Sequence, residues 1–257
     1  MNNQGQATSP VTTSDDAFNI GGRATPARNG LEWWTKAWPL FTRQIGMWIG
    51  LIVVTFIVFA VVSLIPVIGQ LAITLFWPAV AGGLMLGARE VDRDGVLGFG
   101  HLTAGFSKDA GQLILLGVAY LVGMVVAAGI AMLIAGVGMG TMLMGASGGG
   151  TPAAMGAVGA ASVLLAVLIA VALLVPVYMA TWFAPALIVF HGTGAVDAMK
   201  ASFFGCLKNI VPFLVYGLVG LLLAIVASIP FGLGWLVLGP VLVISVYVGY
   251  RDIYLAR

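Results

Sequence analysis

Long apolar stretches separated by short polar segments dominate the chain. Six of these stretches have about the length that a helix needs to cross roughly 30 Å of bilayer hydrocarbon. They cover residues 45–65, 69–88, 113–135, 160–189, 210–229 and 235–250. The alternation typical of barrel strands is absent, and only helices and closed barrels satisfy their backbone hydrogen bonds in lipid. The pattern therefore predicts an all-α integral membrane protein with six transmembrane helices.

A short segment before each pair of predicted spans repeats apolar residues every three or four positions. The first segment holds Leu31, Trp34, Trp38, Phe41 and Ile45, the second Phe99, Leu102, Phe106 and Leu113, and the third Val196, Met199, Phe203 and Leu207. Polar and charged residues occupy the other faces, as in helices that lie in the plane of a membrane interface. We expect three helical hairpins, each preceded by a cytoplasmic interfacial amphipathic helix.

The spacing of phenylalanine and proline suggests that these three units are internal repeats. Phe41 and Pro78 are 37 residues apart, as are Phe203 and Pro240. The middle unit is about 42 residues longer and contains a glycine-rich loop over 136–159. The units would span about residues 31–90, 96–192 and 194–252, within a membrane domain 30–257 that follows a disordered cytoplasmic tail 1–29. Coincidence among proline-containing apolar helices is the alternative.

The composition restricts the class of protein further. Hydrophobic residues make up 61% of the 257 and charged residues 8%, with a mean hydropathy of +1.09. Soluble domains carry about 25% charged residues, so a soluble enzyme is excluded. The net charge of +2 is too small to indicate a nucleic-acid partner. All 11 Lys and Arg fall on one side of the six-span arrangement, which predicts a cytoplasmic location for that side and for both termini.

Three local sequences carry a resemblance to known proteins. They are the tryptophans Trp33, Trp34 and Trp38, the step Phe76–Ala79, and the segment Ser202–Asn209 before the fifth span. Over residues 31–256 the chain resembles a group of uncharacterised bacterial inner-membrane proteins. That group is similar in layout to the membrane domain attached to some glycerophosphodiester phosphodiesterases. The resemblance implies six spans in a bacterial cytoplasmic membrane and no activity, because the catalytic phosphodiesterase domain has no counterpart here.

The spans hold few groups that could do chemistry. They contain no Asp, Glu, Lys or Arg, which argues against a proton-driven pump. The pattern Gly145-x-Ser147-x-Gly149 matches a nucleophile elbow, but no His, Asp or Glu lies on the same side of the membrane. The same loop contains Met139, Met142, Met144 and Met155, which would suit Cu(I) or simply an apolar loop. His101 and His191 lack metal-ligand spacing. We expect no enzymatic activity, no cofactor and no metal.

The leading hypothesis is a non-enzymatic polytopic inner-membrane protein that organises membranes, interacts with lipids or supports other membrane proteins. Its partners would be membrane lipids, other membrane proteins or a second copy, with no nucleic acid. Headgroup contacts would come from the amphipathic helices. The candidate residues are Trp34, Trp38, Arg43, Phe106, Lys108, Phe203 and Lys208.

The alternative is a permease or channel for a small neutral or lipid-like solute through the centre of the three hairpins. Pro78, Pro185 and Pro240 would line that pathway, because helices bent at proline free backbone carbonyls. A wet central cavity lined by these prolines would favour transport. A centre filled with Leu, Val and Phe would argue against it.

Overall fold

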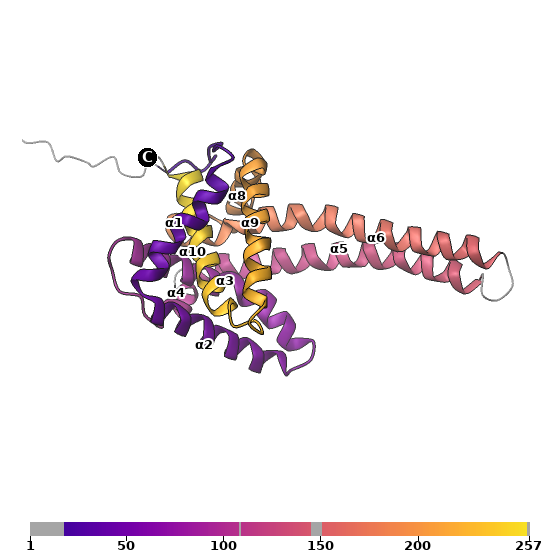
Figure 1. Cartoon of the computed structure of the whole chain (residues 1–257), viewed down its shortest axis with the longest axis horizontal. Helices are drawn as coiled ribbons and strands as arrows, with labels where there is room; N and C mark the ends of the chain where they lie inside the picture. The colour runs from indigo at the N-terminus through magenta and orange to yellow at the C-terminus, as the bar shows by residue number, and fades with distance from the viewer. Residues whose placement is uncertain (1–17, 108, 145–150, 256–257) are drawn as a thin grey trace, which may run out of the picture.

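The computed structural model of the protein describes residues 18–107, 109–144 and 151–255, and the regular elements of this part of the chain are helices (Figure 1). The helices are α1 (Asn29–Arg43), α2 (Ile45–Ser63), α3 (Ile68–Asp92), α4 (Gly100–Ser107), α5 (Ala110–Met144), α6 (Pro152–Trp182), α7 (Ala184–His191), α8 (Ala195–Lys208), α9 (Ile210–Ser228) and α10 (Trp235–Tyr254). The side chains of residues 152–155 are not described.

Six helices of the described chain are long and apolar enough to cross a membrane, judged by length and composition. They are α2, α3, α5, α6 continued by α7, α9 and α10. Each one overlaps a stretch that the hydropathy pattern predicts, although α5 extends to Met144, beyond the predicted end at residue 135. The prediction of an all-α protein with six membrane-spanning helices is therefore confirmed at this level.

α5 and α6 pack against each other along their lengths and project from the rest of the molecule as a long arm (Figure 1). Small residues allow the close approach: a Cβ on Gly138 would lie 2.4 Å from the side chain of Ser162. The predicted glycine-rich loop over 136–159 is wrong for most of its length, because α5 continues to Met144 and α6 begins at Pro152. Residues 145–150, with the Gly-x-Ser-x-Gly pattern, lie outside the described residues.

The short helices α1, α4 and α8 each pack mainly on helices outside the pair that follows them in the chain. α1 packs on α9 and α10, α4 on α3, and α8 on α6 and α7. The pairs α2–α3, α5–α6 and α9–α10 are thereby linked in a ring. In this ring α1 connects the first pair to the last.

The core lies around α10, where 72% of the residues in the apolar window are buried. Aromatic rings from distant segments meet there. Trp33 of α1 lies with its ring centroid 5.2 Å from that of Phe213 of α9. Phe183, between α6 and α7, packs 5.6 Å from Tyr254 of α10. These rings attach α1 to the body rather than leaving it free on a membrane surface.

Residues 18–28, which we name the N-terminal strap, lie against the ends of α7, α9 and α10. The Phe18 ring stacks on the His191 imidazole with centroids 3.5 Å apart. The buried Asn209 side chain accepts hydrogen bonds from the backbone N–H and the hydroxyl of Thr25, at 2.7 and 2.9 Å. The prediction of a disordered tail over 1–29 is therefore wrong for residues 18–29, because buried polar groups need partners and this segment supplies them. Residues 1–17 lie outside the described residues.

Candidate functional site

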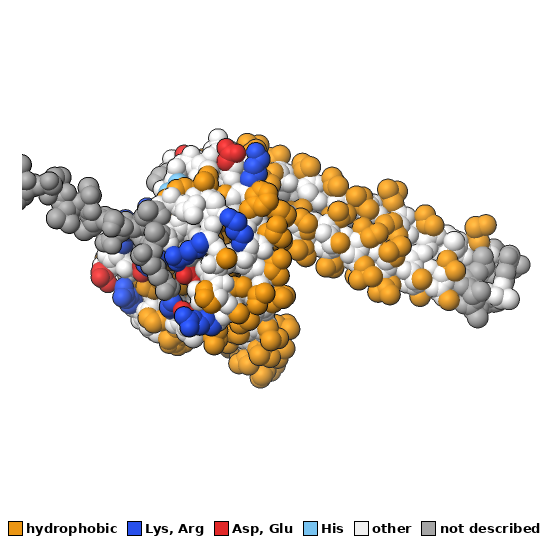
Figure 2. Space-filling model, turned by 90° about the horizontal axis from the view of Figure 1, so that it is seen from above, with side chains coloured by type: hydrophobic (Ala, Val, Ile, Leu, Met, Phe, Trp, Pro, Cys, Tyr) orange, Lys and Arg blue, Asp and Glu red, His pale blue; other side chains and the backbone are white. Residues whose placement is uncertain are grey.

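Charged side chains gather at one end of the molecule, and the α5–α6 arm carries none (Figure 2). Between Asp109 and Asp197 the chain has no Lys, Arg, Asp or Glu. The ion pairs of the described residues join the strap, α1, α8, and the C-terminal ends of α3 and α10. We call this region the charged end. Its separation from the apolar arm is the asymmetry that a protein crossing a membrane requires.

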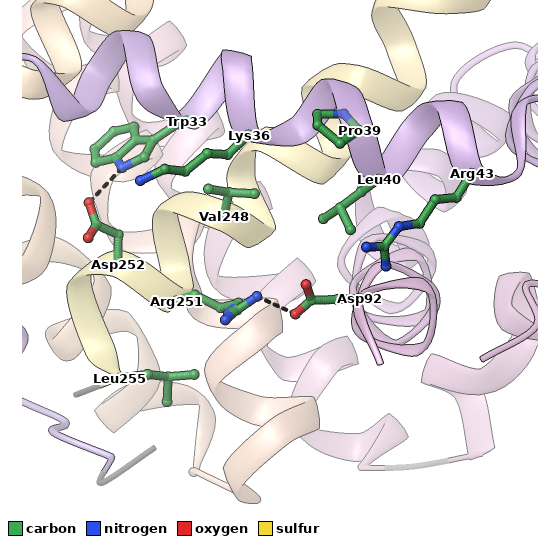
Figure 3. Close-up of a pocket in the computed structure, with 10 residues that line it drawn as sticks. All are labelled: Trp33, Lys36, Pro39, Leu40, Arg43, Asp92, Val248, Arg251, Asp252 and Leu255. Atoms are coloured by element: carbon green, nitrogen blue, oxygen red, sulfur yellow. Dashed lines mark hydrogen bonds and ion pairs between the residues drawn. The ribbon is translucent and has the colours of Figure 1, made fainter. Parts of the chain in front are cut away.

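A pocket of about 420 Å³ opens between α1 and α10 at the charged end (Figure 3). We call it the charged pocket. Its lining combines three cations with acidic and apolar side chains. The lining residues are Trp33, Lys36, Pro39, Leu40, Arg43, Asp92, Val248, Arg251, Asp252 and Leu255. Two turns of α1 supply Lys36 and Arg43, while the last turn of α10 supplies Arg251.

The three cations of the charged pocket are anchored but remain accessible. Arg251 pairs with Asp92, which also accepts a hydrogen bond from the Tyr247 hydroxyl at 2.9 Å. The Arg43 guanidinium donates to Asp94 at 2.9 Å, and the Lys36 ammonium pairs with Glu32 at 2.6 Å. The three cationic side chains are 44–47% exposed. A guanidinium has five N–H donors, so pairing with one carboxylate leaves donors for a further anion.

Asp252 forms a buried wall of the charged pocket and has a different role. Its carboxylate accepts hydrogen bonds from the Asn29 amide at 2.6 Å and the Trp33 indole N–H at 3.0 Å. Arg23 of the strap pairs with it at 3.3 Å. These partners come from the first 33 residues, so Asp252 connects the two ends of the chain. Its partners are protein groups, which makes it a structural carboxylate.

Two apolar grooves lie between candidate spans. The larger, about 850 Å³, lies between α2 and α3. It is bordered by Phe99, just before α4, and by Leu102 and Phe106 of α4. The smaller, about 550 Å³, lies between α9 and α10 and is bordered by Trp34 and Trp38 of α1. Both are lined almost entirely by apolar side chains. Grooves of this kind can accommodate acyl chains through van der Waals packing, because lipid tails are as apolar as the groove walls.

The two predicted tryptophans of α1 have different environments. Trp38 is 52% exposed and borders the α9–α10 groove. Trp34 is only 5% exposed. Its ring stacks on Tyr216, and its indole N–H donates to the Tyr216 carbonyl at 3.1 Å. We therefore correct the assignment of Trp34 to the headgroup-contacting set, because its one polar group already has a partner inside the protein.

The other predicted interface residues lie apart. Arg43 lines the charged pocket, and Phe106 borders the α2–α3 groove. Phe203 of α8 is half-buried against Phe204. The Lys208 ammonium donates to the carbonyls of Gly21 and Gly22 and so helps to hold the strap. Lys108 lies outside the described residues. The structure thus distributes these residues over the three short helices instead of gathering them into one site.

A third, more enclosed cavity of about 190 Å³ lies where α3, α5, α6, α7 and α10 meet. Pro78 and Pro185 line it, whereas Pro240 is buried in α10 and is not among its lining residues. A pathway lined by these prolines stays a prediction. Its other walls are apolar side chains and a few hydroxyls. The described part of the chain shows no group of three or more His, Cys, Asp or Glu arranged to hold a metal ion.

The sequence pattern missed Lys36, Asp92 and Arg251 as members of one pocket. They are separated by up to 215 positions, and only the packing of α1 on α10 brings them together. One signal pointed to Arg251: it follows Pro240 by 11 residues, just as Arg89 follows Pro78. That spacing identifies a repeated position but does not show what the side chain contacts.

A comparison with curated proteins finds one relevant similarity. The chain is 33% identical over 222 residues to a protein of Burkholderia thailandensis described as a probable inner membrane protein. The match covers 80% of this chain and 77% of the relative. No family model and no solved structure matches the chain. The likeness in layout to the membrane domain of glycerophosphodiester phosphodiesterases stays a prediction.

Proposed function

Since the chain belongs to the same family of inner membrane proteins as the Burkholderia relative, we propose that it is a non-enzymatic protein that binds anionic phospholipids at its charged end. In this proposal the protein organises lipids or supports other membrane proteins, and it does so through its surface. Support comes from the candidate spans, which hold no Asp, Glu, Lys or Arg before the last turns of α3 and α10. A buried acid–base pair for chemistry is therefore not available there.

The orientation follows from the charges. The charged end faces the cytoplasm, together with both chain termini, because positively charged residues are retained on that side. The pairs α2–α3, α5–α6 and α9–α10 then enter the membrane from the cytoplasm as three hairpins. The helices α1, α4 and α8 lie at the cytoplasmic interface, each on the hairpin of a neighbouring unit. The exposed face of α1, with Trp38 and Lys36, suits the headgroup layer.

The observation that carries the proposal is the chemistry of the charged pocket. Lys36, Arg43 and Arg251 surround a floor that includes Leu40 and Val248. A lipid phosphate would take the donors that the carboxylates leave free, and the glycerol region would contact the apolar floor. Exposed ion pairs are worth at most about 1 kcal/mol each, so their exchange for a lipid phosphate costs little.

The proposal is tested by the lipids that the purified full chain retains. Native mass spectrometry would compare phosphatidylglycerol with phosphatidylcholine of the same acyl chains. Replacing both Lys36 and Arg43 by Gln should lower the preference for phosphatidylglycerol by about 2 kcal/mol, or roughly 30-fold, at about 1 kcal/mol per cation. Arg28 and Lys200, replaced together by Gln, are the matched control, because these cations lie outside the pocket and the change in net charge is the same. Equal losses in the two double variants would contradict a pocket and indicate a diffuse charge effect.

One observation favours a second candidate, a permease or channel for a small neutral or lipid-like solute. Pro78 and Pro185 line the 190 Å³ cavity at the meeting point of the three helix pairs. Transport would require this cavity to open to each side of the membrane in turn. A cysteine at Ala81, which lines the cavity, should then react with a membrane-impermeant maleimide from both sides when Cys206 is replaced by Ala. Protection from both sides would argue against a pathway.

A further inference from the structure

In the proposed orientation, the cavity between α3, α5, α6, α7 and α10 lies inside the membrane, between the charged end and the opposite ends of the spans. Tyr120, in its wall, is ten residues from the start of α5, or about 15 Å along the helix axis. α5 has 35 residues and continues to Met144, so Tyr120 lies inside this candidate span. The lining consists of Trp77, Pro78, Ala81, Leu84, Met85, Tyr120, Tyr178, Thr181, Trp182, Pro185, Leu242, Val243 and Val246. The binding of headgroups at the charged end makes no use of it.

Three of the side chains that line this cavity carry hydroxyl groups. The Tyr120 hydroxyl donates to the Tyr178 hydroxyl at 3.2 Å, which leaves the proton of Tyr178 available to an acceptor on a ligand. The Thr181 hydroxyl donates to the Val177 carbonyl at 2.9 Å, and its oxygen can still accept. No Lys, Arg, Asp or Glu is among the lining residues. A charged ligand would find no counter-ion here, so the ligand is neutral.

The size and the opening of the cavity restrict the ligand further. An apolar cavity of about 150 Å³ in another protein accommodates benzene, so about 190 Å³ holds one six-membered ring with small substituents. Leu84 and Pro185 form a buried floor. Trp77 and Tyr178 are 43% and 47% exposed, so the opening faces sideways, toward the surrounding lipid.

We propose that this cavity binds a neutral, lipid-soluble molecule whose head is a single six-membered ring bearing carbonyl or hydroxyl oxygens. The ring occupies the space above Leu84, and one of its oxygens accepts the Tyr178 proton. A hydroxyl group on the ring can also donate to the Thr181 oxygen, and any apolar tail leaves past Trp77 into the bilayer. A plain acyl chain would fit the apolar walls but would leave the Tyr178 proton without an acceptor. That mismatch disfavours the acyl chain relative to an oxygen-bearing ring.

The test uses the full chain in nanodiscs of uncharged phosphatidylcholine and a decyl-substituted benzoquinone as the probe. Trp77 and Trp182 line the cavity, so a bound quinone should quench their fluorescence in a saturable manner. Ala81→Phe fills the cavity and should abolish the saturable component. Ala60→Phe is the matched control, because Ala60 is exposed on α2 and lines none of the cavities described above.

A milder variant guards against misfolding of Ala81→Phe. Tyr178→Phe removes one exposed hydroxyl and should weaken binding of the quinone roughly three- to tenfold, the worth of one hydrogen bond. Decylbenzene, which lacks the oxygens, should compete about three- to tenfold less well than the quinone, because it cannot accept the Tyr178 proton. Wild-type binding by Ala81→Phe, or equal competition by decylbenzene, would overturn the proposal. Because the discs carry no anionic lipid, the result is independent of headgroup binding at the charged end.

Discussion

The two ends of the chain are held together by the buried carboxylate of Asp252, and its removal should destabilise the whole protein. Asp252→Leu leaves the Asn29 amide and the Trp33 indole N–H, both buried, without the acceptor that they now share. An unsatisfied buried donor costs about 1–3 kcal/mol, so the two together predict a loss of about 2–6 kcal/mol. For a chain of this size each kcal/mol lowers the melting temperature by about 2–4 °C, which gives a decrease on the order of 10 °C.

The assay is thermal unfolding of the purified protein in detergent, followed by tryptophan fluorescence. Asp252→Asn keeps one acceptor oxygen and should fall between the wild type and Asp252→Leu. Asp197→Leu is the matched control, because Asp197 is exposed and its pair with Lys200, at 3.6 Å, is worth less than about 1 kcal/mol. If Asp252→Leu melts within about 2 °C of Asp197→Leu, the inference that this carboxylate holds the strap and α1 to α10 is refuted.

Three further predictions use the same structure. Burial raises the pKa of the Cys206 thiol to about 12, so maleimide should modify it far more slowly near neutral pH than it modifies a cysteine placed at exposed Lys200; equal rates would contradict the packing of α8. Gly83→Ala should lower the melting temperature, because its Cβ would lie 2.0 Å from a backbone carbonyl of α4. Gly129→Ala, whose Cβ meets nothing within 4 Å, should be neutral or slightly stabilising, and the reverse order of the two melting temperatures would show that α3 and α4 are not in contact. With Cys206 replaced by Ala, an impermeant maleimide should label Thr151→Cys from the periplasm and Lys200→Cys only after the membrane is opened, and labelling of both from one side would refute the proposed orientation.

The six spans could be predicted because the tendency to cross a bilayer is a local property of about 20 residues. The length of the α5–α6 arm could not be predicted from the sequence. Glycines such as Gly138 and Gly159 favour a loop when read along the sequence. In the structure their missing side chains let α5 and α6 approach, with Ser162 and Met142 occupying the space. The same residue type thus indicates a turn locally and a helix contact in three dimensions, and only the partner helix decides between them.

Helical periodicity identified one face of α1 as apolar, but it did not reveal what covers that face. Trp34 and Trp38 both lie on the predicted stripe, yet Tyr216, 182 positions later, covers Trp34 and leaves Trp38 exposed. The N-terminal strap is held in the same way by a distant residue, because Thr25 donates its hydrogen bonds to Asn209. Arg43 could be identified from the sequence because it is a charged residue next to a predicted span. The charged pocket around it could not, because the pocket forms only where α10 packs on α1.

The ring of short helices gives these long-range contacts a common physical origin. Each short helix packs on a helix outside the pair that follows it in the chain, as α4 does on α3 and α8 on α6. The pair α9–α10 is covered by α1, the short helix that precedes α2–α3 in the chain. The buried indoles of α1, the strap and the three hydrogen-bonding partners of Asp252 all lie at this one junction. The aromatic and polar residues near the N-terminus are concentrated at this junction because α1 closes the ring between the pairs α2–α3 and α9–α10.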